Sequence, residues 1–196
     1  MEIYELKPIL DDPRFDEFDF EELPSLLDND WLYLDFAGKD PGKLSWERVR
    51  LADVWTPQFA KGAVRPFVDY TRVSGIPVFS QRAVSVLREF LEPNGELLPL
   101  LTKKCTYFVY NILKKSTALD VSRSTAKFVP ESSKETAFSV EYFWFDEGKL
   151  DGHSIFRIRE MPAKVLVTNA FMARAEQAGL NGFYFIKVWP FPEGES

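Results

Sequence analysis

The sequence predicts an α+β fold, in which a mostly antiparallel sheet carries a few packed helices within a single domain. Three observations support this prediction. Segments rich in aromatic and β-branched residues recur with polar punctuation between them, two other segments have helical spacing, and no repeat of about 20–50 residues is visible. The chain has 196 residues, 45% of them apolar, which is enough for a core that needs no disulfide or structural metal.

The first third of the chain is predicted to form short strands. Charged and apolar residues alternate over residues 2–6, which predicts an opening strand, and the apolar residues of 31–36 predict another. Pro and Gly are frequent over residues 53–77. They exclude long helices there and favour short strands around Val64 and over residues 67–70.

A first helix is predicted over residues 81–91. Ser80 can cap its N-terminus, and Pro93, followed by Asn94 and Gly95, ends it in a turn. Apolar residues recur with i, i+1, i+4, i+7, i+8 spacing and would form its inward face. These residues are Ala83, Val84, Leu87, Phe90 and Leu91.

The middle of the chain is predicted to continue the sheet. Residues 106–113, 118–121 and 138–145 are rich in aromatic and β-branched residues, which favours antiparallel strands. Residues 122–136 contain four serines and few large apolar groups. We therefore expect a mobile loop between the second and third of these strands.

The last third predicts a strand, a helix and a strand in succession. Residues 164–167 form the first strand, Thr168 caps the helix, and Gly179 ends the helix in the left-handed conformation. Residues 183–188 form the final strand. The inward face of this helix would consist of Phe171, Ala175 and Ala178.

The charge of the chain is unevenly distributed. The net charge is −6, and residues 11–30 hold nine acidic residues and one arginine, whereas the other 176 residues sum to +2. We therefore describe residues 1–50 as an N-terminal acidic extension with short strands, packed on a main α+β domain over residues 51–196. Phosphate binding needs clustered cations, so we expect no nucleic-acid partner and favour a cationic protein.

The acidic segment has two open interpretations. It can be a solvated face whose Phe and Leu side chains enter the core, or a docking surface for an electropositive partner. In the second case the carboxylates face the partner and Phe18 or Phe20 serves as an apolar anchor. The candidate partner-binding residues are Asp16, Glu17, Phe18, Asp19, Phe20, Glu21 and Glu22.

Neither a membrane span nor export is favoured. No apolar run exceeds five residues, whereas a span needs about twenty. Residues 1–6 lack the basic start and apolar stretch of a secretory signal. We therefore expect a cytoplasmic protein with no membrane partner.

Candidate catalytic and anion-binding residues are few. Any Ser/His or Cys/His mechanism must use His153, the single histidine, but its position in a turn favours a plain surface role. Cys105 follows two lysines that could activate a thiol, yet it begins an apolar strand and is predicted to be a small core residue. Arg157 and Arg159 alternate with apolar residues around a strand at 155–158. Both could contact an anion from one face, or pair with neighbouring acids.

No motif defines a metal or cofactor site. The glycines are scattered, unlike those of a phosphate-binding loop, and no His or Cys cluster has zinc spacing. Five carboxylates lie among the aromatic strands, but no spacing brings two of them together, so we predict no metal and no cofactor. They are Asp120, Glu141, Asp146, Glu147 and Asp151. The five Trp and eighteen Phe either fill the core or line a ligand pocket.

A succession of short motifs over residues 50–190 resembles one known family. The first motifs are Trp55-Thr56-Pro57, Phe67-Val68-Asp69 and Ile76-Pro77-Val78-Phe79-Ser80-Gln81-Arg82-Ala83. The next are Asn94-Gly95-Glu96 with Pro99, Tyr107 to Tyr110 with Asn111, Ala118-Leu119-Asp120 with Ser124, and Ile155-Phe156-Arg157. The last and most specific are Val167-Thr168, Phe171, Ala178-Gly179-Leu180-Asn181-Gly182-Phe183 and Trp189. In this order they resemble the eleventh immunity-protein family of bacterial polymorphic toxin systems.

The resemblance implies a cytoplasmic protein that binds and neutralises a toxin, normally encoded beside it, without catalysis. It names no catalytic residues, and the first 50 residues do not share it. An acidic surface suits a toxin with a basic cleft, so the toxin could be a nuclease. The alternative is a small-ligand or peptide-binding regulatory module without catalytic activity. An enzyme acting through carboxylates, arginines or His153 is a third hypothesis, and a homo-oligomer is left open.

Overall fold

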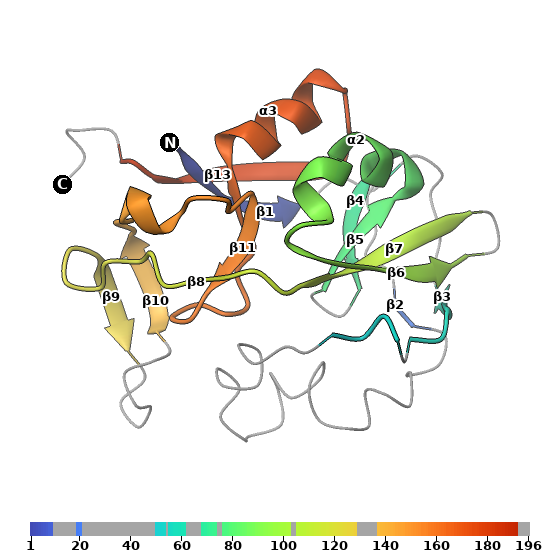
Figure 1. Ribbon diagram of the computed structural model, residues 1–196, viewed down its shortest axis with the longest axis horizontal. Helices are drawn as coiled ribbons and strands as arrows, with labels where there is room; N and C mark the ends of the chain where they lie inside the picture. Colours follow the sequence, from blue (N-terminus) through green and yellow to red (C-terminus); the bar gives the residue numbers. More distant parts are fainter. Residues whose placement is uncertain are drawn as a thin grey trace.

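A computed structural model describes residues 1–9, 19–20, 50–53, 55–61, 68–73, 76–102, 105–128 and 137–191. Over these residues the fold is mostly β-sheet with two α-helices (Figure 1). The strands form a six-stranded, a five-stranded and a two-stranded sheet, and most neighbouring strands are antiparallel. The predicted mixture of antiparallel sheet and a few helices is confirmed, although the strands are divided among several sheets.

The six-stranded sheet has the order β2-β3-β6-β7-β5-β4. Its strands are β2 (Asp19–Phe20), β3 (Gln58–Lys61), β4 (Tyr70–Val73), β5 (Ile76–Ser80), β6 (Gly95–Leu101) and β7 (Thr106–Ile112). The longest pairing joins β6 to β7, with Gly95 opposite Ile112 and Leu101 opposite Thr106. No strand is predicted from the sequence at β6, whose apolar run contains Pro99. In the fold Pro99 lies within the strand, and its carbonyl accepts the indole N–H of Trp55 (2.9 Å).

The five-stranded sheet has the order β13-β1-β12-β11-β8 and joins the start of the chain to its end. Its strands are β1 (Ile3–Pro8), β8 (Lys115–Ser116), β11 (Ile155–Ile158), β12 (Leu166–Thr168) and β13 (Phe183–Trp189). β1 pairs with both β12 and β13, so Tyr4 lies opposite Val167 on one side and Lys187 on the other. The predicted opening and closing strands are confirmed. The division at residue 50 stays a prediction.

Both predicted helices are confirmed, together with their caps. α2 (Gln81–Leu91) begins after Ser80, whose hydroxyl accepts the amide of Ala83 (3.0 Å). α3 (Asn169–Gln177) begins after Thr168, and Gly179 follows it with a φ of +60°. The two helices contact each other and lie on one side of the molecule (Figure 1). No helix of the described residues is long and apolar enough to cross a membrane.

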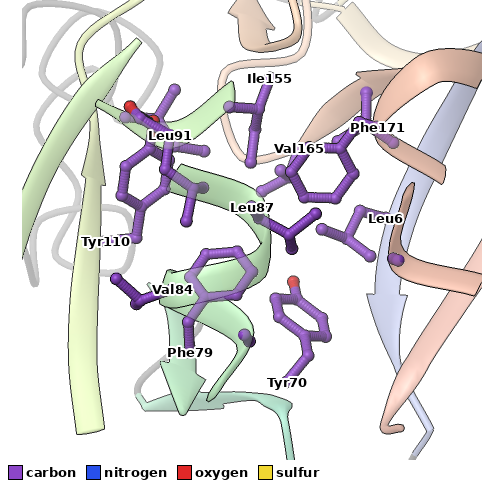
Figure 2. Packing of buried hydrophobic residues seen from close by; sticks show 14 residues of the cluster. Leu6, Tyr70, Phe79, Val84, Leu87, Leu91, Tyr110, Ile155, Val165 and Phe171 are labelled. Carbon is purple, nitrogen blue, oxygen red and sulfur yellow. Dashed lines mark hydrogen bonds between the residues drawn. The ribbon is translucent and has the colours of Figure 1, made fainter. Parts of the chain in front are cut away.

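One buried cluster joins both large sheets and both helices. Figure 2 shows Tyr70 and Phe79 from the six-stranded sheet facing Leu87 of α2, with Leu6 and Phe171 close by. The ring of Tyr70 also stacks on Phe183 of β13, with 4.9 Å between ring centroids. Because side chains from the six-stranded sheet and from β1 and β13 share this core, the two sheets stabilise each other.

The two-stranded sheet was not expected in this form. β9 (Thr125–Phe128) pairs antiparallel with β10 (Ala137–Tyr142), so the loop predicted over 122–136 is wrong for residues 125–128. β9 is not evident from the sequence, because Thr125 and Lys127 are polar and exposed and contribute nothing to the core. The strand predicted over 138–145 is confirmed as far as Tyr142. A short 3₁₀ turn, η1 (Glu147–Lys149), follows.

Two other strand predictions are wrong. Residues 118–121 form no strand, because only Leu119 makes an isolated bridge, to Phe145, before the chain turns. The strand predicted over 67–70 begins only at Tyr70, as β4. The predicted strands at 31–36 and around Val64 lie outside the described residues.

Candidate partner-binding surface

The early and late motifs meet at a buried carboxylate, Asp69. Its Oδ1 accepts the hydroxyl of Ser80 (2.7 Å), and its Oδ2 accepts the guanidinium of Arg82 (2.8 Å) and the amide of Asn181 (3.1 Å). The amide of Asp69 donates in turn to the side-chain oxygen of Asn181 (2.9 Å). Asp69 is only 3% exposed, so these donors replace the water that a buried charge loses. We call these four residues the Asp69 network.

The Asp69 network extends into the turn after α3. Arg82 also donates to the carbonyls of Ala178 (2.7 Å) and Gly179 (3.2 Å). In the same turn Gly182 has a φ of +85°, and a Cβ there would lie 2.3 Å from the carbonyl oxygen of Tyr70. Only glycine tolerates both this conformation and this contact. These motif residues therefore fasten the α3–β13 turn to β4, β5 and α2.

A second buried carboxylate, Glu96 of β6, organises another group of motif residues. Its Oε2 accepts the amide of Leu51 (2.8 Å) and the side-chain amide of Asn111 on β7 (3.0 Å). At the neighbouring Gly95 a Cβ would lie 2.4 Å from the carbonyl oxygen of Asn111 and 2.7 Å from the ring of Tyr110. The motif at 94–96 therefore sets the close approach of β6 and β7 and positions residues 51–52.

The motif of Ala118-Leu119-Asp120 with Ser124 differs because it flanks an exposed turn around Asp120. The carboxylate accepts the hydroxyl of Ser122 (2.6 Å) and the amide of Arg123 (3.2 Å), and chiefly the Ser122 bond holds the pKa of Asp120 below its usual value. The hydroxyl of Ser124 accepts the amide of Trp144 (3.0 Å), and the amide of Asp120 donates to the Trp144 carbonyl (2.8 Å). The turn is thereby attached to the backbone of residue 144.

Four consecutive aromatic residues at this place alternate between core and solvent. Phe143 and Phe145 are 4% and 2% exposed and belong to a buried cluster that also contains Phe156. Tyr142 and Trp144 point the other way and are each 40% exposed. The alternation is that of an extended chain with one face on the core and the other in water.

A β-bulge helps to bring Tyr142 to the surface. The pairing of β10 with β9 shifts register between Val140 and Tyr142, so Glu141 and Tyr142 are both exposed although they are adjacent. Glu141 forms an ion pair with Lys127 on β9 (2.9 Å). Bulges of this kind re-aim side chains and are frequent beside functional sites.

Two ring contacts order the exposed side chains. The guanidinium of Arg123 lies 3.7 Å from the ring centroid of Trp144, and the ring of Tyr142 meets Phe191 edge-on at 4.8 Å. Val121, in the same turn as Arg123, is also exposed. We define the aromatic surface as Val121, Arg123, Tyr142, Trp144 and Phe191. Exposed, ordered groups of this composition are typical of protein-binding surfaces.

Most of the predicted acidic docking residues lie outside the described residues. These are Asp16, Glu17, Phe18, Glu21 and Glu22. Asp19 and Phe20 form β2, opposite Lys61 and Ala60 of β3. In Figure 1, β2 and β3 lie at the opposite end of the long axis from β9 and β10. The docking role of the acidic segment stays a prediction.

The two arginines predicted to share one face have different surroundings. Arg157 lies within β11, is 5% exposed, and donates its backbone amide to the carbonyl of Lys114 (3.1 Å). Arg159 follows the last residue of the strand and is exposed. The fold therefore presents Arg159 to solvent and covers Arg157, and anion contact by either stays a prediction.

His153 and Cys105 both lie in turns. His153 lies in the turn before β11, with Nδ1 3.0 Å from the carbonyl of Asp151 and Nε2 3.3 Å from that of Lys115. The prediction that Cys105 is a core residue is wrong, because it is exposed in the β6–β7 turn. There the hydroxyl of Thr102 accepts the amide of Cys105 (3.0 Å).

The described residues contain no group of three or more His, Cys, Asp and Glu side chains that could hold a metal ion. Three of the five predicted carboxylates have local partners. Asp120 caps its own turn, Glu141 pairs with Lys127, and Asp146 lies 3.6 Å from Lys149. Glu147 lies 3.6 Å from the terminal amine of Met1.

An open groove between α2 and α3 is lined by Ser85, Val86, Arg88, Glu89, Glu92 and Arg174. Its charged side chains face one another, with Arg88 at 2.7 Å from Glu92 and Arg174 at 4.0 Å from Glu89. Small-molecule sites are instead concave and mostly apolar, with a few converging polar groups. The groove therefore gives no support to the ligand-binding alternative.

The aromatic surface is the feature that sequence reasoning missed. The sequence places the aromatic residues in the core or in a ligand pocket, and it predicts a loop over residues 122–136. The run Tyr142-Phe143-Trp144-Phe145 contained the missing signal, because alternate residues of a strand face opposite sides. One pair of a four-residue aromatic run must therefore point away from the core of a sheet covered on one face.

A model of the immunity protein family Imm11 matches residues 98–189. The matched range runs from β6 to the end of β13 and contains both the Asp120 turn and the Gly182 turn. The resemblance indicated by the motifs is thereby confirmed over this range, where the chain is similar to a family of toxin-related immunity proteins. No curated protein is similar enough to the chain to count as a match.

Proposed function

We propose that this chain is a bacterial immunity protein that binds and neutralises a cognate polymorphic toxin in the cytoplasm, without catalysis and without a cofactor. The observation that carries the proposal is the match of residues 98–189 to an immunity protein family. The two buried carboxylates, Asp69 and Glu96, fit this role, because their hydrogen bonds stabilise a scaffold. A partner would therefore contact exposed residues of the outer surface.

The charge of the chain supports a basic toxin, and a nuclease in particular. Enzymes that grip phosphates carry cationic clefts, and an acidic protein is electrostatically complementary to such a cleft. This chain is acidic in that sense, with a net charge of −6 and nine acidic residues within 11–30. Complementary charge raises the association rate and rejects wrong partners more than it raises affinity.

The direct test uses the toxin domain encoded beside the gene of this chain, purified and titrated with the full chain in a calorimeter. We expect a one-to-one complex and loss of toxin activity at equimolar immunity protein. Nuclease activity on plasmid DNA and on RNA identifies the substrate. If the domain does not bind and keeps its activity in molar excess of the chain, the proposed function is wrong.

Charge reversal tests the acidic segment separately. The triple variant Asp16→Lys, Glu17→Lys, Glu21→Lys should associate about tenfold more slowly at low salt and show a flatter salt dependence. The matched control is Glu89→Lys, Glu92→Lys, Glu176→Lys, which reverses three exposed helical carboxylates and has the same net charge. If both variants associate alike, the acidic segment has no docking role beyond its charge.

A further inference from the structure

We infer that the aromatic surface is the apolar anchor by which this chain holds a basic toxin domain. The inference rests on the proposed function and adds to it the surface that makes the contact. It concerns the far end of the molecule from β2, and residues that belong to none of the recognised motifs.

The composition of the aromatic surface is that of a binding hot spot. Trp, Tyr and Arg are the residues that most often dominate the energy of protein interfaces, and one of each is exposed here beside Phe191. Monomeric proteins seldom leave large aromatic rings in water side by side without a use for them. Tyr142 ends the short two-stranded sheet and Trp144 follows two residues later, while Val140 of β10 and Phe143 enter the core.

The surface is ordered before a partner arrives. Arg123 is held over the Trp144 ring by its backbone, since its amide donates to Asp120 while the Asp120 amide donates to the Trp144 carbonyl. Phe191 braces Tyr142 from the C-terminal side. Groups fixed in this way lose little conformational entropy on binding, which favours tight complexes.

The charge around the aromatic surface selects the partner. The described residues of 118–128 and 137–151 contain five acidic and three basic side chains. Of the described cations near the surface, Lys127 pairs with Glu141 and Lys149 lies beside Asp146. The surroundings are therefore net negative, and their complement is a protein surface with exposed cations around an apolar or aromatic centre.

The aromatic surface and the acidic segment should act on different rate constants. Long-range charge changes association, whereas buried aromatic anchors chiefly change dissociation.

The test measures association and dissociation of the purified adjacent-gene toxin domain with the double variant Tyr142→Ala, Trp144→Ala. Loss of a hot spot weakens binding by about 30-fold or more, so we expect that loss, mostly as faster dissociation. Arg123→Gln alone should weaken binding about fivefold, because it removes one charged group and leaves both rings. Far-UV circular dichroism and thermal unfolding verify that each variant is folded.

The matched control is Phe59→Ala, Tyr184→Ala, which removes two exposed aromatic rings from β3 and β13. It should bind the toxin domain as the unchanged chain does. If the control weakens binding as much as the Tyr142 and Trp144 variant, or if the folded Tyr142 and Trp144 variant binds normally, the inference is wrong while the proposed function stands. If the unchanged chain forms no complex with the toxin domain, both are wrong.

Sedimentation of the chain alone tests whether the aromatic surface binds a second copy of this chain instead of a toxin. We expect a monomer at micromolar concentration. A dimer that the Tyr142 and Trp144 variant dissociates would mean that the aromatic surface is a self-association interface, which contradicts the inference.

Discussion

The Asp69 network and the aromatic surface are built from similar groups, but the first is buried and structural whereas the second is exposed. Both combine a carboxylate, an arginine and backbone amides, but Asp69 is buried by its partners, whereas the Asp120 turn holds Arg123 and Trp144 in water. The residues of the first region are motif residues, and those of the aromatic surface are not. The motifs that indicate the family therefore report on the scaffold, and the partner has to be inferred from exposed residues between them.

The largest effect should come from Gly182→Ala. A Cβ at this position would lie 2.3 Å from a β4 carbonyl and would also need a φ of +85°, so the free energy of unfolding should fall by about 3–5 kcal/mol. Gly152→Ala is the matched control, because Gly152 has a φ of +69° with nothing within 4 Å and should cost about 1–2 kcal/mol. Urea unfolding measures both, and equal losses would show that close approach to β4 does not matter.

Two adjacent aromatic residues test the alternation on which the aromatic surface depends. Phe145→Ala should lower the free energy of unfolding by about 3–5 kcal/mol, because it empties space in the core. Trp144→Ala should cost less than about 1 kcal/mol, because the ring is 40% exposed. Comparable losses in the two variants would contradict the assignment of these side chains to opposite faces.

Removing the charge of Asp69 should have an intermediate effect. Asp69→Asn leaves Arg82 and the Asn181 amide with a weaker acceptor, so we expect a loss of about 2–3 kcal/mol. Glu92→Gln, which breaks the exposed pair with Arg88, is the control and should cost less than about 0.5 kcal/mol. Thermal unfolding distinguishes them, and a similar Tm for both variants would mean that the Asp69 network contributes little.

The smallest predicted effect depends on pH. Burial raises the pKa of Glu160 above its ordinary 4.5, and its Oε2 has no hydrogen-bond partner among the described residues. A raised carboxyl pKa means that stability is lost as pH rises through the interval between the ordinary and the folded value. Glu160→Gln should therefore raise Tm by about 2 °C at pH 7 and leave it unchanged at pH 3.5. A Tm gain that is equal at both values would exclude ionisation as the cause.

Local signals made the helices predictable. Ser80 and Thr168 are side-chain caps that act within three residues, and Gly179 ends α3 through its own backbone conformation. Such features are present in any short stretch of sequence, so α2 and α3 were expected at the positions where they occur.

The strands that escaped prediction depend on distant partners. β6 contains Pro99, and β9 presents Thr125 and Lys127 to water, so neither has the apolar pattern of a typical strand. Each is a strand because another segment pairs with it, β7 in one case and β10 in the other. The exposure of Cys105 has the same origin, since it follows from where β6 and β7 are joined.

The buried networks could be predicted only as a succession of motifs. The contacts of Asp69 with Asn181 span 112 residues, and those of Glu96 with Leu51 span 45. No local pattern states that such residues meet. The exposed face of the aromatic run at 142–145, in contrast, follows from alternation alone once the chain there is known to be extended.

The inferred contact between the aromatic surface and a toxin can be located along the chain. Amide hydrogen exchange of the full chain, with and without the adjacent-gene toxin domain, tests it most directly. We expect slower exchange on complex formation at residues 118–128 and 137–146, and unchanged exchange at the backbone amides of the Asp69 network. A complex that slows exchange elsewhere and leaves both segments unaltered would contradict it.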